Sequence, residues 1–171
     1  TSIKQLTQGN LSHYQMLSEV EKIFKKWSPA IFLGWSNIGF DDEMIRKEFF
    51  KGIRYPYITN ASPNKRHDGI NIARAAYAVD TSVLETEINE KNNPVFKLES
   101  LSRMQGLDSS DAHSALTDAT LTAKILSIIK KRQPNTWDMF LRTANKLDTE
   151  TIFKKEEIFS LNEYFYGKSR L

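Results

Sequence analysis

The apolar residues of the chain recur mostly at helical spacing. Over residues 12–27 they fall on one stripe, and Ser12 with Gln15 supplies a capping box at the start of that stripe, so a helix is predicted there. The same periodicity predicts further helices over residues 41–53, 69–79, 96–106, 112–131 and 135–147. The chain is therefore expected to be rich in helices, with Gly106 ending one of them and Pro134 separating the last two.

One stretch breaks this pattern. Residues 30–35, AIFLGW, form a short continuous apolar run, which is typical of a strand buried on both faces of a parallel sheet. Residues 54–69 contain two prolines, two asparagines and a glycine, and they are predicted to form an irregular loop. A lone strand cannot satisfy its backbone hydrogen-bonding groups. We therefore expect partner strands from a segment upstream, and Thr1 in place of Met also suggests a processed or excised chain.

Composition narrows the class of protein. With 171 residues, 40% hydrophobic and 26% charged, the chain is expected to form one globular core. It contains no apolar run of about 18 residues and no recognisable signal peptide, which favours a cytoplasmic protein without membrane contact. Zero cysteines exclude disulfides and thiolate metal sites. The net charge of +3 is gathered in clusters at residues 25–27, 64–67, 130–132 and 153–155, which suit a polyanion but also suit solvated helix ends.

Two groups of polar residues could carry chemistry. Asp118 heads a stripe continued by Thr122, Ile125 and Ile129, and an ionised acid on such a stripe costs several kcal/mol unless it is paired or binds a cation. His113 lies just before it, where N-cap candidates at residues 109–111 would leave the imidazole in the first helical turn. The alternative is a capping histidine and a hydrogen-bonded acid.

Asp41 follows the apolar strand and a turn, at the carboxyl end where open α/β sheets place ligands. The alternative is that it only stabilises the start of a helix, a role we expect for Asp42 and Glu43. Together, Asp41, Asp118 and His113 suit hydrolysis of a phosphodiester by Mg²⁺, in which two metal ions activate water and stabilise the leaving oxygen. The sequence contains no P-loop, dinucleotide-binding or serine-hydrolase motif.

The motifs in order, GWSNIGFDDEMIRKEFF, ARAAYAVD, FKLESLSRMQG, SSDAHSALTDAT and KKRQPNTWDMF, resemble bacterial exonuclease I, a family of DnaQ-like DEDDh 3′–5′ exonucleases. The resemblance implies a ribonuclease H-like α/β fold, here mostly its helical portion with few strands. It also implies that Asp41 and Asp118 bind Mg²⁺, with Mn²⁺ as a substitute, and that His113 is the general base. The substrate would be the 3′ end of single-stranded DNA, in repair and recombination, with single-strand DNA-binding protein as a partner. Asn37, Arg66 and Lys97 are the expected nucleic-acid contacts.

The chain also departs from the family. The first motif, Asp-x-Glu on an initial strand, is not found; the Asp-x-Glu patterns present fall in helical or polar segments. Lys97 replaces an expected arginine and Asn71 an expected acid. Residues 1–133 are predicted to be the C-terminal part of the exonuclease domain, and residues 134–171 a helical extension toward an SH3-like region. We therefore expect this chain alone to be inactive or nearly so. Two alternatives stay open: a catalytically dead module that binds nucleic acid or a protein, and a helical interaction domain.

Overall fold

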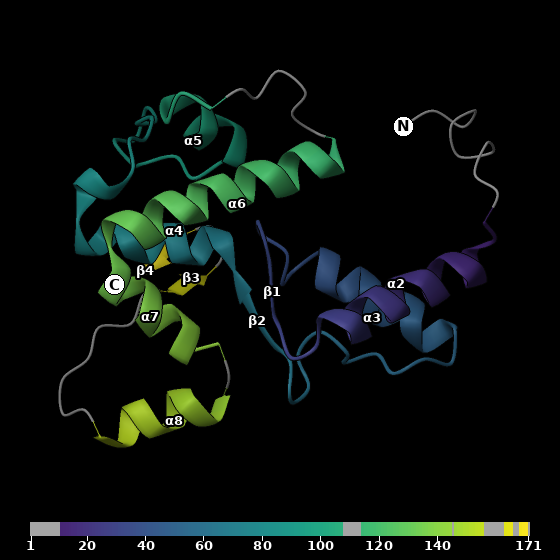
Figure 1. Cartoon of the computed structure of the whole chain (residues 1–171). Coiled ribbons are helices and arrows are strands. Elements are labelled where there is room, and N and C mark those ends of the chain that lie inside the picture. The colour runs from purple at the N-terminus through teal and green to yellow at the C-terminus, as the bar shows by residue number, and fades with distance from the viewer. Residues whose placement is uncertain (1–10, 108–113, 145, 156–162, 166–167, 171) are drawn as a thin grey trace. The chain divides into compact units, whose positions relative to one another are not determined.

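The computed structural model describes residues 11–107, 114–144, 146–155, 163–165 and 168–170 (Figure 1). These residues form helices and two small two-stranded sheets, so the predicted α/β class with few strands is confirmed. The internal contacts of the chain divide it into two compact units. Unit 1 comprises Thr1–Phe32 and Gly39–Lys65, and unit 2 comprises Leu33–Ile38 and Arg66–Leu171.

Unit 1 contains helices α2 (His13–Trp27) and α3 (Asp41–Lys51). The predicted capping box of α2 is confirmed: the Ser12 hydroxyl accepts the Gln15 N–H, and the Gln15 side chain accepts the Ser12 N–H at 2.8 Å. The core of the unit is made of Leu17, Phe49 and Ile58, with Val20, Phe24 and Ile45 packed around them. The helical spacing of Ile45, Phe49 and Ile53 predicts one inward stripe for α3. This prediction is wrong at Ile53, which is 97% exposed, because the helix ends at Lys51 and Ile53 has a left-handed φ of 54°.

The parallel sheet pairs β1 (Ile31–Gly34) with β2 (Lys65–Asp68). The prediction of a loop at residues 65–68 is therefore wrong. This segment has no alternating apolar pattern, and its pairing is fixed instead by backbone and amide hydrogen bonds. The Lys65 N–H donates to the Ala30 carbonyl at 2.9 Å, and the buried side chain of Asn64 accepts the Ala30 N–H at 3.0 Å.

The side chains of strand β1 are more exposed to solvent than the sequence predicts. The residues Ile31, Phe32 and Gly34 are half-buried and Leu33 is 36% exposed, whereas a continuous apolar run suggested burial on both faces. Among the described residues, β1 has β2 as its only partner strand. The sequence predicts a sheet with few strands, and in such a sheet an apolar strand keeps part of its surface exposed.

Unit 2 is built around one long helix, α6 (Ala115–Arg132), which contacts α4 (Gly69–Val79), the 3-10 turn η1 (Thr81–Val83), α5 (Leu98–Met104) and α7 (Pro134–Arg142) (Figure 1). Its buried face includes Ile125 and Ile129, as predicted. For α4, helical spacing predicts Ile70, Ala73 and Tyr77 as the inward face. The structure instead buries Gly69, Ile72, Ala73 and Ala76. Ala73 and Ala76 are fully buried in the core cluster that also contains Ile125 and Ile129 of α6.

The end of α6 is tied to its neighbours by side-chain hydrogen bonds. The Arg132 guanidinium donates to the Val83 carbonyl at 2.9 Å, and the Gln133 amide donates to the Ala76 carbonyl at 3.1 Å. Pro134 then occupies the first turn of α7, where its missing N–H carries no cost. The remaining elements are α8 (Lys146–Lys155) and the antiparallel pair β3 (Glu163–Phe165) and β4 (Lys168–Arg170). The domain boundary predicted after residue 133 stays a prediction.

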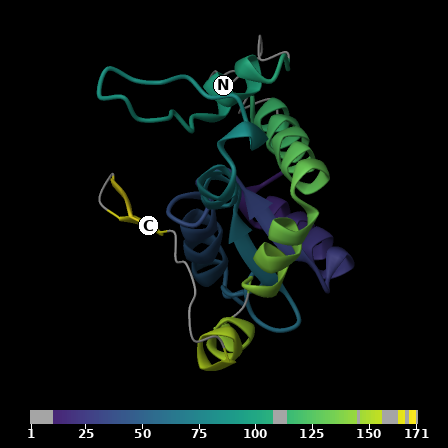
Figure 2. The same ribbon diagram turned by 90° about the vertical axis from the view of Figure 1, so that its left-hand side faces the viewer.

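Between η1 and α5 the chain extends in a long loop (Figure 2). The loop is closed by an antiparallel bridge between Ile88 and Pro94 and turns at Asn92, which has a left-handed φ of 58°. Gly106, with φ of 69°, ends α5 as the sequence predicts. No helix in the described part of the chain combines the length and apolar character needed to span a membrane.

Candidate active site

Asp41 is the first residue of α3, at the surface of unit 1. Three acids occupy the first turn of this helix, and the N-cap residue Phe40 gives it no side-chain hydrogen bond. Asp42 is buried, and Glu43 is ion-paired with Arg46, whereas Asp41 is exposed. Asp41 is thus the most exposed acid of this turn.

Asp118 lies in the first turn of α6, in unit 2, where the buried face of the helix reaches solvent. Its carboxylate is half-buried, and one turn further on Thr122 is buried and donates its hydroxyl to the Asp118 carbonyl at 2.8 Å. The helix is capped by Ser114, so it begins after His113 in the sequence. His113 itself lies outside the described residues. The predicted helix start, with an N-cap among residues 109–111 and His113 in the first turn, is therefore wrong, because Ser114 supplies the cap and the helix begins at Ala115.

The described residues contain no group of three or more acids or histidines placed to hold a metal ion. The two Asp-x-Glu patterns of the sequence, Asp41–Glu43 and Asp148–Glu150, lie in α3 and α8 rather than on a strand. Carboxylate oxygens are the ligands that Mg²⁺ prefers, so Asp41 and Asp118 fit this ion in chemistry. In the two-metal site that the resemblance implies, they would supply two of the carboxylates. Asp41 belongs to unit 1 and Asp118 to unit 2.

The predicted nucleic-acid contacts Asn37, Arg66 and Lys97 all belong to unit 2. Asn37 is buried, Arg66 is half-buried in β2, and Lys97 is exposed at the start of α5. Asn37 and Lys97 lie in segments that a hydrogen bond connects, because the Trp35 indole N–H donates to the Phe96 carbonyl at 3.2 Å. The structure therefore links the turn after β1 to the residue preceding Lys97.

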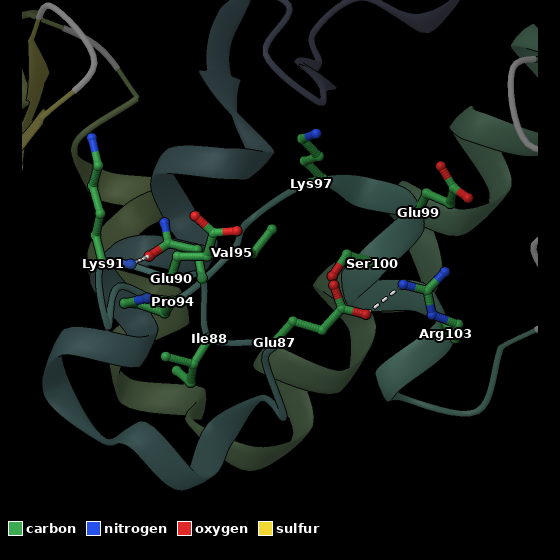
Figure 3. Close-up of a pocket in the computed structure, with 11 residues that line it drawn as sticks. Glu87, Ile88, Glu90, Lys91, Pro94, Val95, Lys97, Glu99, Ser100 and Arg103 are labelled. Carbon is green, nitrogen blue, oxygen red and sulfur yellow. Dashed lines mark hydrogen bonds and ion pairs between the residues drawn. The ribbon is translucent and has the colours of Figure 1, made fainter.

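Lys97 also lines an open cavity of about 860 Å³ between the long loop and α5 (Figure 3). Glu87 and Arg103 form an ion pair across this cavity. The hydrogen bond from Arg103 is the main cause of a lowered pKa of the Glu87 carboxyl, and the same pair raises the pKa of Arg103. The other charged residues of the cavity are Glu90, Lys91, Lys97 and Glu99. Acids and bases are balanced in number, so the lining as a whole carries no net positive charge.

The residues at the carboxyl ends of β1 and β2 form a close-packed cluster that the sequence did not reveal. Asp68 is buried and caps α4 by accepting the Ile70 N–H at 3.1 Å, and it also accepts the Ser36 N–H at 2.8 Å. The signal for the cap was present, since an aspartate stands directly before a helix that begins with Gly69. The contact to Ser36 crosses 32 positions and has no sequence signature.

His67 is expected to make the free energy of unfolding depend on pH. Burial lowers the pKa of its imidazole below the ordinary value of 6.5, and the charge of Asp68 offsets this only in part. Its ring packs edge-on against Phe140 at 6.0 Å between centroids. Because the fold favours neutral histidine, stability should be complete above pH 6.5 and should decrease as pH falls from there toward the lowered pKa.

Denaturant unfolding of wild type and of His67→Gln between pH 5 and 7.5 tests this expectation. The wild type should lose stability toward pH 5, and the variant should show a flatter profile. Identical slopes in wild type and His67→Gln would contradict the prediction.

No family model matches the chain. Exodeoxyribonuclease I of Buchnera aphidicola subsp. Schizaphis graminum is 32% identical over 158 residues, which is 90% of this chain and 33% of that protein. Exodeoxyribonuclease I of Escherichia coli K12 is 33% identical over 115 residues, 67% of this chain and 24% of that protein.

Solved structures agree with these relatives. E. coli exonuclease I in complex with a dA16 oligonucleotide matches with a TM-score of 0.76 and 27% identity, over 82% of this chain and 30% of that one. The zinc-bound form of the E. coli ExoI–ssDNA complex (TM-score 0.75, 27% identity) and the ExoI/SSB-Ct complex (0.73, 26%) each match over 82% of this chain and 30% of theirs.

These matches first define the class of the protein: its fold is that of ribonuclease H-like nucleases. The chain is a homologue of bacterial exonuclease I, which confirms the resemblance seen in its motifs. It spans about a quarter to a third of the length of these two relatives (24% and 33%).

Proposed function

We propose that the chain is part of a single-strand-specific 3′–5′ exodeoxyribonuclease of the exonuclease I type, acting in DNA repair and recombination in the cytoplasm. The observation that carries this proposal is the match to exodeoxyribonuclease I over 90% of the chain, a stretch that includes the Asp41 and Asp118 motifs. The polarity and the single-strand preference follow from the family resemblance.

The proposed cofactor is Mg²⁺, with Mn²⁺ as a substitute. Asp41 is the exposed acid at the start of α3, and Asp118 lies where the buried face of α6 meets solvent, so each can offer carboxylate oxygens to a hard cation. The metal ions, when bound, would activate water and stabilise the leaving oxygen. His113 would accept the proton of the attacking water.

The proposed substrate is the 3′ end of single-stranded DNA. Exposed aromatic rings in unit 1, among them Tyr55, Tyr57 and Phe50, offer faces on which bases can stack. The solved relatives that hold an oligonucleotide, and the ExoI/SSB-Ct complex, support DNA as ligand and single-strand DNA-binding protein as a partner of the whole enzyme.

The isolated chain is expected to bind single-stranded DNA without degrading it, because one pair of acids cannot complete a two-metal clamp. The test incubates the purified 171-residue chain with an oligonucleotide labelled at its 3′ end, in Mg²⁺ and in a chelator control. Release of labelled nucleotide should equal that of buffer, while fluorescence anisotropy should show tighter binding to the single strand than to a blunt duplex.

Robust Mg²⁺-dependent release of mononucleotides by this chain would contradict the proposal of an incomplete site. A chain that binds neither DNA nor metal would favour the helical interaction domain instead. The remaining alternative is a binding module that has lost its catalytic activity. The sequence upstream of this chain in the parent gene distinguishes the two. An apolar strand with Asp-x-Glu there supports the enzyme, and its absence supports the binding module.

A further inference from the structure

The carboxylate of Asp68 joins two distant segments of unit 2. A single oxygen, Oδ1, accepts the Ser36 N–H at 2.8 Å and the Ile70 N–H at 3.1 Å. Asp68 is only 5% exposed, so water cannot readily replace it as the acceptor for these two donors. Of the two bonds, the one to Ile70 is an ordinary helix cap, whereas the one to Ser36 reaches the turn that follows β1, residues 35–38, which we call the β1 turn.

The β1 turn needs such support because its backbone is unusual. Ser36 has a φ of 59°, in the left-handed region that non-glycine residues seldom occupy. The neighbouring backbones also approach closely: a Cβ added at Gly69 would lie 2.8 Å from the Gly34 carbonyl oxygen, and one added at Gly34 would lie 2.7 Å from the Asn37 Cβ. The backbone before the β1 turn therefore packs closely against the start of α4, and the Asn37 side chain packs against Gly34.

The β1 turn also contacts the segment that precedes α5. The Trp35 indole N–H donates to the Phe96 carbonyl, and the Phe96 ring packs edge-on against Tyr77 of α4 at 5.6 Å between centroids. Lys97 follows directly. A continuous path of contacts thus runs from Asp68 through Ser36 and Trp35 to the residue adjoining Lys97.

We propose that Asp68 is a positioning residue of the nucleic-acid site: its Oδ1 fixes the β1 turn, and through the Trp35 indole it fixes the segment that carries Lys97. Asn37 and Lys97 are then held in one arrangement before DNA arrives, which lowers the cost of ordering them on binding. This inference rests on the proposed function, because it assigns those two residues to DNA binding. Since both hydrogen bonds end on one oxygen, the role requires an acceptor and not a negative charge.

The test compares three variants of the 171-residue chain with wild type. Asp68→Asn keeps an acceptor oxygen, and Asp68→Ala removes it. Asp80→Ala is the matched control, because Asp80 follows the same helix α4 and accepts the Ser82 N–H at 2.8 Å in an equivalent cap. Amide hydrogen exchange at Ser36 and the indole N–H resonance of Trp35 report the turn by NMR, and anisotropy of a labelled oligonucleotide reports DNA affinity.

Asp68→Ala should lose the protection of the Ser36 amide, shift the Trp35 indole and Lys97 amide resonances, and weaken single-strand binding by about tenfold, comparable with the loss of one buried hydrogen bond. Asp68→Asn and Asp80→Ala should bind DNA within about twofold of wild type on the same reasoning. Trp35→Phe should weaken the binding of single-stranded DNA while the Ser36 amide stays protected from exchange. If Asp68→Ala does not fold, Trp35→Phe is the variant that tests the proposal.

Several outcomes would overturn the positioning role. One is wild-type affinity in Asp68→Ala despite an unprotected Ser36 amide. Another is an Asp68→Asn variant as weak as Asp68→Ala, because the charge would then matter. Wild-type affinity in Trp35→Phe would also overturn it. Failure of the wild-type chain to bind single-stranded DNA is a separate result, and it would reject the proposed function before any variant is compared.

Discussion

Replacing His113 with alanine is expected to lower the rate of nucleotide release by about 100-fold or more in an active enzyme that contains this sequence. The resemblance to exonuclease I assigns the general base to His113, and alanine cannot accept the proton of the attacking water. The measurement is the initial rate of release from single-stranded DNA in saturating Mg²⁺ at neutral pH. Binding of the oligonucleotide, measured separately, should change little.

The control for this experiment is His13→Ala. His13 begins α2, is exposed, and pairs with Glu48 at 3.1 Å, so its loss should leave the rate unchanged. A rate for His113→Ala within twofold of wild type would remove this histidine from the mechanism. Equal losses in both variants would point to damage of the fold rather than of the chemistry.

The second large effect concerns stability, at two neighbouring positions of α3. Phe49 is fully buried between Leu17 and Ile58, whereas Phe50 is 74% exposed. Phe49→Ala should lower the free energy of unfolding by about 3–5 kcal/mol, because it removes a buried ring and leaves a cavity. Phe50→Ala should stay within about 0.5 kcal/mol of wild type.

Urea unfolding followed by circular dichroism measures both variants. Domains are typically stable by about 5–15 kcal/mol, so the loss in Phe49→Ala is a large share of the total. Comparable losses at the two positions would contradict the packing described for unit 1. Phe50→Ala also serves the functional account, since a weakened affinity for single-stranded DNA without loss of stability would show that this exposed ring stacks on bases.

Most of the helices could be predicted from sequence because they carry local signals. The helix predicted over residues 135–147 is too long, since α7 ends at Arg142, and α8 was not predicted. The capping box at Ser12, the Gly106 turn and Pro134 all lie where the structure has helix ends. Strand β2 could not be predicted, because its residues Lys65–Asp68 are polar and its pairing depends on Ala30, which is far away in the chain and contacts Lys65 and the preceding Asn64. The prediction for the buried face of α4 was wrong at Tyr77, because the helix buries the small side chain of Ala76 instead.

Some residues of the candidate site could likewise be predicted from sequence, and others could not. Asp41 and Asp118 could be proposed from sequence, since each stands at a position that helix periodicity defines: the first residue of α3 and the first turn of α6. The role of Asp68 could not, because its bond to Ser36 exists only when β1 and β2 lie side by side. His113, outside the described residues, stays a prediction.

The most direct test of the account is a nucleotide-release assay on two forms of the protein: the 171-residue chain, and a longer form with an upstream strand that carries Asp-x-Glu. The account predicts that only the longer form releases nucleotides, from the 3′ end of single-stranded DNA, only with a divalent metal ion, and that Asp41→Asn and Asp118→Asn each abolish release. Release by the longer form that survives both substitutions would contradict it.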